Sequence, residues 1–245
     1  MLADAIVNGA TVLEKSLAHR AMSSDSALAE SVKTYVVCFS AHDDLLTQWK
    51  TYGSWGAGFS IGFDRLRLEE AFKPSVTLAD LAKGFAAMRP DTRLIKVKYT
   101  VDAQRAQLKR AFARFAGTLS QDCTEQEMQR CASAIADNVA LSASQFKHPG
   151  FELETEWRVM IATIFAGIYP LEKTDELHFR ASSRTIVPYF KTPKQVEGKL
   201  PIISVTIGPT LHRSLSEQSL VALLRSKGYS GVPVKTSTLP LTRTD

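Results

Sequence analysis

Two groups of strand-like sequence enclose two long helical patterns, and this order is the feature that most constrains the fold. Segments rich in β-branched and aromatic residues occur before residue 65 and again after residue 150. A doubly wound parallel sheet would instead need strands and helices in regular alternation. The order therefore predicts an α+β fold with a mixed, largely antiparallel sheet and a central group of helices. We expect one domain over residues 1–245, with a helical insertion at about 65–145.

Local patterns predict the individual elements. Strands are expected over residues 34–40, 58–64, 94–99, 154–161, 184–190, 202–207 and 232–236, and helices over residues 2–21 and 214–227. A short helix should begin at Asp43 or Asp44, and two long amphipathic helices should fill the centre of the chain. Capping-box spacings of Ser or Thr with Glu mark two helix starts, Thr124 with Glu127 and Ser214 with Glu217.

The cysteines and the apolar runs bear on the cellular compartment. Three cysteines, an odd number without CxxC spacing, indicate free, buried thiols in a reducing compartment. The first residues lack a basic segment followed by an apolar core, so they do not form a signal peptide. The longest apolar run, residues 159–169, is too short to span a bilayer. These features predict a cytoplasmic protein without membrane contact.

The net charge of +5 is compatible with anionic partners. One predicted helix carries a basic stripe of Arg105, Lys109, Arg110 and Arg114. Such a stripe is either a solvated helix face or part of a nucleic-acid groove. Lys and Arg are otherwise scattered along the chain, so we do not expect nucleic acid as the primary partner. The sequence does not define an oligomeric state.

The segment 154–161 carries the chemically most informative pattern. If it is extended, Trp157, Val159 and Ile161 form an apolar core face, because alternate side chains of a strand share a face. The other face then carries Glu154, Glu156 and Arg158. An arginine beside Glu156 would keep that carboxylate ionised and oriented. The alternative is a solvated sheet face, with Arg158 and Glu156 as a structural ion pair.

A second pattern places small residues on one face of the segment 58–64. Gly58, Ser60 and Gly62 alternate with three apolar side chains. Glycine inside a strand marks close approach of a ligand or close packing against a helix, and both interpretations stay open. Neither GxxxxGKS nor GxGxxG occurs, so the pattern is not a phosphate loop.

Other polar residues are weaker candidates. Ser40 ends a predicted strand, where its hydroxyl could face a ligand or could hydrogen-bond locally at a helix start. Arg180 could pair with a phosphate or with a surface carboxylate, and Tyr189 lies in the following strand. The five histidines lack metal-ligand spacing and neither HExxH nor GxSxG occurs, so no metal site is expected and a hydrolase triad has no support.

Three stretches together resemble a bacterial family catalogued as domain of unknown function 2971. The first runs from YVVCFS at 35–40 through Asp44, Trp49 and Tyr52 to GFSIGFD at 58–64. The second is the segment 147–158, which ends in ExEWR, and the third leads from Arg180 to IVPY at 186–189. The resemblance covers roughly residues 34–64 and 147–209.

Fuller members of that family are similar to ADP-ribosyltransferases. The similarity implies that NAD is the substrate nucleotide and that Glu154 or Glu156 bonds its ribose as nicotinamide leaves. It places Ser40, Ser60 and Gly62 near the nicotinamide pocket. It further implies that Arg158 orients the carboxylate, that Arg180 holds a phosphate, and that Tyr189 completes the cofactor-binding set.

The chain also departs from the family pattern. It begins after the family's upstream HYT-like strand and hairpin, so it has no counterpart of the dinucleotide-positioning histidine. This difference implies either a misplaced start or an N-terminally truncated member. The alternative function is therefore a non-catalytic binding or regulatory module, and a nucleic-acid binder is less favoured.

Overall fold

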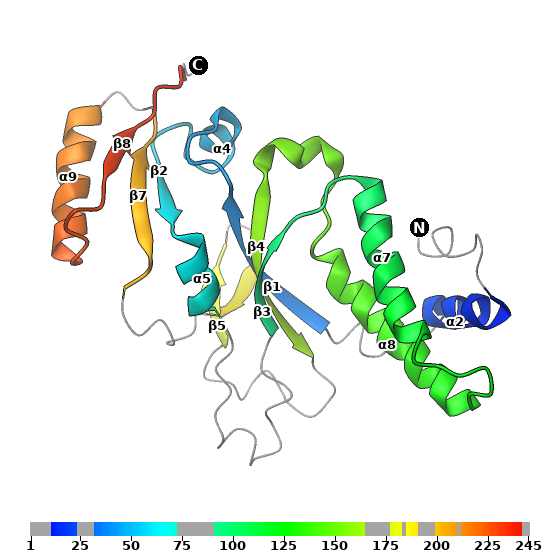
Figure 1. Ribbon diagram of the computed structural model, residues 1–245. Helices are drawn as coiled ribbons and strands as arrows, with labels where there is room; N and C mark the ends of the chain where they lie inside the picture. The colour runs from blue at the N-terminus through cyan, green and yellow to red at the C-terminus, as the bar shows by residue number, and fades with distance from the viewer. Residues whose placement is uncertain are drawn as a thin grey trace, which may run out of the picture. The chain divides into compact units, whose positions relative to one another are not determined.

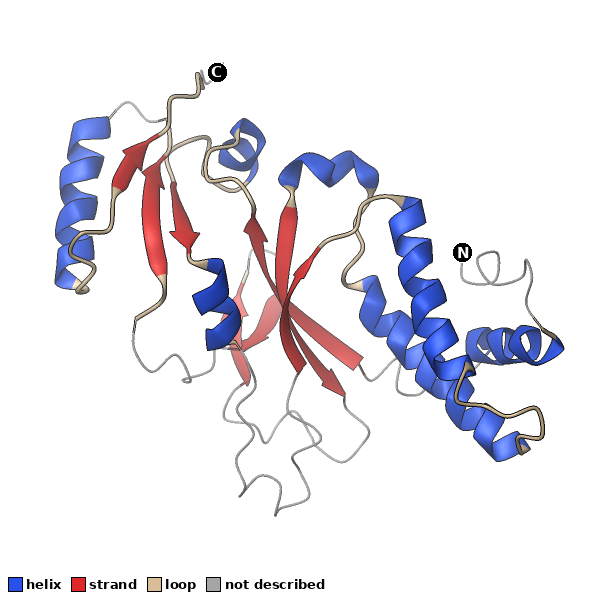
Figure 2. Ribbon diagram, viewed as in Figure 1, coloured by secondary structure: helices blue, strands red, loops and turns tan. Residues whose placement is uncertain are grey.

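The computed structural model describes residues 11–23, 32–72, 91–164, 177–182, 185–190, 199–209 and 212–241 (Figure 1). Its helices are α2 (Val12–Ser23), α4 (Leu46–Thr51), α5 (Arg65–Ala71), α7 (Val101–Ala116), α8 (Glu125–Ala143), the 3-10 helix η2 (Pro149–Glu154) and α9 (Arg213–Ser226). Its strands are β1 (Val32–Ser40), β2 (Phe59–Phe63), β3 (Asp91–Lys96), β4 (Glu156–Ile164), β5 (Leu177–Ala181), β6 (Ile186–Phe190), β7 (Ile202–Ile207) and β8 (Val234–Thr236). Figure 2 shows the resulting mixture of helices and strands, which confirms the α+β class.

The chain divides into two compact units. Unit 1 comprises Met1–Cys38, Pro74–Leu153 and Arg158–Thr192. Unit 2 comprises Phe39–Lys73, Glu154–Trp157 and Pro193–Asp245. That residues 1–245 form a single domain stays a prediction.

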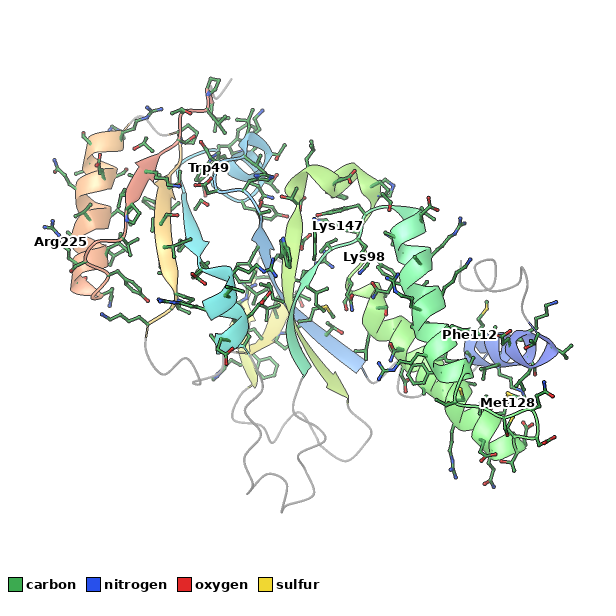
Figure 3. All side chains as sticks on the ribbon, viewed as in Figure 1. Trp49, Lys98, Phe112, Met128, Lys147 and Arg225 are labelled. Carbon is green, nitrogen blue, oxygen red and sulfur yellow. The ribbon has the colours of Figure 1, made fainter. Side chains whose placement is uncertain are left out.

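Helices α2, α7 and α8 pack together in unit 1 (Figure 1). Their shared core includes Leu17 of α2, Phe112 of α7 and Ile135 of α8, all at most 4% exposed. Apolar residues recur at three- and four-residue spacing on α7 and α8, so each helix presents one apolar stripe to the other two. Figure 3 shows Phe112 and Met128 in this layer. The two amphipathic helices predicted from the sequence are confirmed.

The capping box at the start of α8 is also confirmed. The Thr124 hydroxyl accepts a hydrogen bond from the Glu127 backbone N–H at 3.3 Å, and the Thr124 N–H donates to the Glu127 carboxylate at 2.7 Å. The two bonds give partners to the backbone N–H groups of Glu127 and Thr124, which the helix itself leaves unsatisfied. The bond from Thr124 holds the pKa of Glu127 below its ordinary value.

Substitution of this cap should weaken the fold measurably. We expect Thr124→Ala to lower the free energy of unfolding by about 1 kcal/mol, because the substitution removes one side-chain acceptor at the helix start. Chemical denaturation measures the difference, with Ser120→Ala in the preceding exposed loop as the matched control. The Glu127 carboxylate stabilises the helix start when it is ionised, at pH values above its ordinary pKa. The difference in the free energy of unfolding between the wild-type protein and Thr124→Ala should therefore shrink as the pH falls through the lowered pKa of Glu127. Equal stability of both variants at neutral pH would contradict the role of the cap.

The described strands form three sheets. Strand β4 lies between β1 and β3 in the first, β7 lies between β2 and β8 in the second, and β5 pairs with β6 in the third. The pairs β2/β7 and β5/β6 are antiparallel, whereas β7 and β8 are parallel. Parallel neighbours need a crossover connection, and α9 provides it. In unit 2, α9 packs Leu220 and Leu224 against Val205 and Ile207 of β7.

Two predicted helix starts are wrong. The N-cap of α4 is Leu45, without a side-chain cap bond, and Asp44 instead accepts a hydrogen bond from the Trp49 indole at 2.6 Å. The N-cap of α9 is His212, so Ser214 lies inside the helix and does not cap it. In both cases the polar residue near the start has the right chemistry for a cap but lies at the wrong position of the first turn.

The burial of β1 and the start of β4 both differ from expectation. Cys38 is exposed, as are Val36 and Val37, whereas Cys131 is buried as predicted. An apolar strand run does not by itself ensure that both sheet faces are covered. Strand β4 begins at Glu156 and not at Glu154, and β5 was not predicted.

No helix in the described parts of the chain combines the length and apolar character needed to cross a membrane.

Candidate functional site

The predicted acidic strand face is interrupted at Thr155. Residues from Pro149 to Glu154 form a 3-10 helix, and Thr155 has a φ of +42° before β4 begins at Glu156. A left-handed residue reverses the local chain direction, so strand alternation does not extend back across it. The prediction that Glu154, Glu156 and Arg158 share one strand face is therefore wrong for Glu154. Glu156 and Arg158 keep their two-residue spacing within β4.

Ser40 ties the end of β1 to this junction. Its hydroxyl donates a hydrogen bond to the Glu154 carbonyl at 3.0 Å and accepts one from the His42 N–H at 3.2 Å. The N–H of the next residue, Ala41, donates to the Thr155 carbonyl at 3.2 Å. The bond from His42 is local, as one alternative expected, but the bond to Glu154 joins segments that are far apart in the sequence. The contacts bring Ser40 and Glu154 together in unit 2.

Thr155 combines two features that folded proteins usually avoid. A β-branched residue with positive φ is a conformational outlier, because its Cβ crowds the backbone. Its hydroxyl is also buried without a hydrogen-bond partner. A strained residue with an unsatisfied buried group is common at functional sites, where the surrounding structure holds it in place. Nothing in the residue types around position 155 signals a left-handed turn, so the sequence analysis missed Thr155.

Glu156, the next residue, is almost completely buried. Its exposed fraction is 4%, and glutamate is rarely buried to this degree unless it interacts with another polar group. The neighbouring Trp157 is half-buried, and the Arg65 guanidinium lies 4.7 Å from its ring centroid. This cation–π contact fixes the first residues of β4 against the start of α5. The backbone is therefore held on both sides of Glu156, by the Ala41 bond to Thr155 and by the Arg65 contact with Trp157.

Arg158 makes a structural contact within unit 1. Its guanidinium donates a hydrogen bond to the carbonyl of Ser144, the C-cap residue of α8. A cation at a helix C-terminus satisfies a free carbonyl and interacts favourably with the helix dipole. The Ser144 hydroxyl in turn contacts the sulfur of buried Met160 at 3.7 Å. Arg158 therefore fastens β4 to the end of α8, whereas the structural ion pair with Glu156 stays a prediction.

Removal of this contact should destabilise the protein. We expect Arg158→Met to lower the free energy of unfolding by about 1.5 kcal/mol, because the Ser144 carbonyl loses a charged donor. Arg158→Lys should recover part of the loss, since it retains the positive charge at the helix end. Thermal unfolding measures both variants, and Arg114→Met on the exposed side of α7 is the matched control. If Arg158→Met melts like the control, the guanidinium does not anchor α8.

The small-residue face of β2 packs against β7. Ser60 pairs with Thr206 and Gly62 with Ser204 in the antiparallel register. A Cβ added at Gly62 would lie 2.5 Å from the Ser204 hydroxyl, so a larger residue would require the Ser204 side chain to shift. Close approach of another element thus accounts for this glycine, although the element is a strand and not the expected helix.

Asp43 makes a charged contact with the second sheet, beside the pair of Ser60 and Thr206. Thr206 pairs with Lys235 of β8, and the Asp43 carboxylate accepts hydrogen bonds from Lys235 at 3.0 Å and from Thr206 at 3.4 Å. The bond from Lys235 is the main cause of a lowered pKa at Asp43. These contacts attach the segment after β1 to the second sheet of unit 2.

The remaining predicted site residues belong to the β5/β6 hairpin of unit 1. Arg180 is exposed and pairs in register with Val187, whereas Tyr189 pairs with His178, the ring centroids being 5.5 Å apart. The predicted site residues therefore divide between the two units. Unit 2 contains Ser40, Ser60, Gly62, Glu154 and Glu156, and unit 1 contains Arg158, Arg180 and Tyr189.

Other charged groups offer no metal site in the described residues. There, no three His, Cys, Asp or Glu side chains cluster in a way that could hold an ion. The four basic residues of α7 are exposed. Burial, followed by repulsion from Arg110, lowers the pKa of Lys98. Figure 3 labels Lys98 and Lys147, whose backbones are joined by a hydrogen bond from the Lys147 N–H to the Lys98 carbonyl at 3.2 Å.

Comparison with known proteins identifies one similarity. Residues 48–159 match a family model described as "Protein of unknown function (DUF2971)". DUF2971 is thus the family that this part of the chain matches. The match includes Ser60, Gly62, Glu154, Glu156 and Arg158, and it overlaps the resemblance seen in the sequence at residues 48–64 and 147–159. No curated protein and no solved structure matches the chain significantly, so the ADP-ribosyltransferase-like architecture stays a prediction.

Proposed function

We propose that the Glu154–Glu156 junction is the active site of an ADP-ribosyltransferase-like enzyme that cleaves NAD. The observation that carries this proposal is the buried carboxylate of Glu156 directly after a strained threonine whose hydroxyl has no partner. Backbone strain and an unsatisfied polar atom at Thr155 both lower stability, and they lie directly beside the buried carboxylate of Glu156. Such a coincidence is typical of a site whose geometry serves chemistry and not folding.

The chemistry would use Glu156 as a fixed negative charge. Cleavage of the bond between nicotinamide and ribose leaves the bonding electron pair on the nicotinamide nitrogen, and positive charge develops on the ribose. An acceptor nucleophile then forms the new bond to the same ribose carbon and loses its proton to solvent. A carboxylate in a water-poor environment stabilises the developing charge more strongly than one in water.

Some of the other predicted residues receive supporting roles in this proposal. Ser40 would position the junction through the Glu154 carbonyl, whereas the Ser204 contact explains Gly62 without a ligand. Arg158 fixes β4 behind the carboxylate. Arg180 and Tyr189 belong to unit 1 and receive no role in this proposal.

Nicotinamide release tests the proposal directly. Purified protein incubated with millimolar NAD should release nicotinamide faster than a buffer control, with or without an added protein acceptor. Chromatography of the products separates nicotinamide from intact NAD. Absence of release, together with absence of NAD binding by calorimetry, would overturn the proposal.

A non-catalytic binding or regulatory module is the second candidate. The contact between Arg158 and the C-terminus of α8 favours it, because that contact gives the arginine a structural purpose without any ligand. In that case Glu156 would also be structural, and its neutralisation would lower the melting temperature without altering any turnover. For either function we propose a bacterial, cytoplasmic setting, because of the family resemblance and the three cysteines.

A further inference from the structure

A short loop after α4 exposes two large aromatic side chains. Tyr52 is 69% exposed and Trp55 is 53% exposed, although tryptophan is among the side chains that gain most from burial. The exposed Lys50 ammonium lies 6.0 Å from the centroid of the Trp55 ring, at the outer limit of a cation–π contact. With about half of its side chain exposed, Trp55 remains accessible to a second planar group.

Glycines fix this loop to the rest of unit 2. The Gly208 N–H donates a hydrogen bond to the Gly58 carbonyl at 3.0 Å, and a Cβ at Gly208 would lie 2.4 Å from the Gly56 carbonyl oxygen. Gly56 is buried, and a Cβ there would lie 2.6 Å from the Leu241 side chain. The indole is therefore carried on a loop whose backbone is packed against the end of β7.

The backbone that presents the indole is strained. Ser54 and Trp55 have φ values of 48° and 58°, and Gly56 follows at 86°. Glycine adopts such angles readily, but at Ser54 and Trp55 the Cβ crowds the following carbonyl oxygen. Strain of this kind persists where surrounding structure enforces it, and it often accompanies a function. A loop that only connected α4 to β2 would be more stable with glycine at position 55.

We propose that Trp55 and Lys50 form a nucleotide-binding platform, in which a nucleobase stacks on the indole and a phosphate pairs with the ammonium. Every nucleobase has a π-face, and aromatic side chains beside cations are the usual means of holding unpaired bases. The basic character of the chain, with a net charge of +5, favours an anionic ligand over a neutral aromatic one. This site goes beyond the proposed NAD cleavage and does not depend on Glu156.

Binding of adenosine 5′-monophosphate tests the platform. Calorimetry and quenching of tryptophan fluorescence should detect binding to the wild-type protein. The dissociation constant should rise about tenfold or more in Trp55→Gly, because base stacking is lost, and clearly less in Trp55→Phe. Adenosine without phosphate and ribose 5-phosphate without base should each bind more weakly than the nucleotide. Lys50→Gln should weaken the nucleotide but not adenosine.

Control variants show whether nucleotide binding depends on Trp55 itself. Phe151→Ala removes another exposed ring with a lysine over it, Lys147 at 4.8 Å, and should leave binding unchanged. The melting temperature of Trp55→Gly should not fall below that of Trp55→Phe, since glycine relieves the strain. The measured quantity is binding at Trp55 and not turnover, so failure of NAD cleavage does not affect this result.

Three outcomes would overturn the platform. The first is wild-type affinity in Trp55→Gly, and the second is equal affinity for ribose 5-phosphate and the nucleotide. Absence of binding by both the mononucleotide and a six-residue single-stranded oligoadenylate also overturns it. If the oligoadenylate binds far more tightly and Trp55→Gly abolishes that binding, the platform stands and the base comes from a nucleic-acid strand.

Discussion

Replacement of Glu156 by Gln should reduce nicotinamide release from NAD at least a hundredfold. The substitution preserves the shape of the side chain and removes only its charge. Loss of one fixed electrostatic group that stabilises a transition state typically costs two to three orders of magnitude in kcat. The effect should appear in kcat more than in KM, because the positive charge on the ribose develops only as the bond breaks.

Two neighbouring glutamates provide matched controls. Glu152 is exposed in the same 3-10 helix, so Glu152→Gln should leave release unchanged. Glu154 contributes its backbone carbonyl to the Ser40 bond, which Glu154→Gln retains, so the expected loss is below tenfold. A larger loss in Glu154→Gln than in Glu156→Gln would show that Glu154, and not Glu156, carries the reactive carboxylate.

Thermal unfolding of the same variant distinguishes the two candidate functions. A buried structural ion pair that loses one partner typically costs about 3–5 kcal/mol. For a chain of this size that loss corresponds to a fall of roughly 6–20 °C in melting temperature. A catalytic carboxylate held at a cost to stability should give a small change or a gain. A large fall in melting temperature, with NAD release absent from the wild-type protein, would favour the non-catalytic module.

Local sequence patterns were sufficient for the helical part of unit 1. The stripes of α7 and α8 and the capping box at Thr124 depend on residues three or four positions apart, which the sequence displays directly. The antiparallel pairing of β2 with β7 could not be obtained in this way. Gly62 lies close to Ser204, which is remote in sequence. The glycine pattern therefore indicated a close contact but could not identify Ser204 as the partner.

The candidate site shows where pattern analysis stops. Alternation gave the buried Val159 of β4, but Glu156 and Met160 on the opposite face are also buried, so burial in this strand does not follow period two. Alternation failed before the start of that strand, where the 3-10 helix continues to Glu154 and Thr155 takes a left-handed conformation. Residue types do not reveal a threonine with positive φ, since other residues are much preferred there. The same limit applies to Trp55, whose backbone strain also appears only in the structure.

Replacement of Thr155 by Gly should raise the stability of the fold while lowering its activity. Relief of the left-handed conformation contributes about 1–2 kcal/mol, and removal of the unsatisfied buried hydroxyl adds about 1–3 kcal/mol. The greater freedom of glycine in the unfolded chain offsets about 1 kcal/mol of this gain. The expected net effect is a free energy of unfolding higher by about 2 kcal/mol, measured by chemical denaturation at neutral pH. Nicotinamide release should fall about tenfold, since glycine holds Glu156 less rigidly.

Thr155→Val separates the two contributions at this turn. Valine keeps the β-branched shape and the strain but lacks the hydroxyl, so it should gain only about 1 kcal/mol of stability. If valine retains full nicotinamide release, the hydroxyl has no part in the reaction and only the turn geometry matters. If Thr155→Gly is instead less stable than the wild-type protein, position 155 is not strained. The turn before Glu156 would then be unstrained, and the burial of Glu156 would be the remaining support for an active site at this junction.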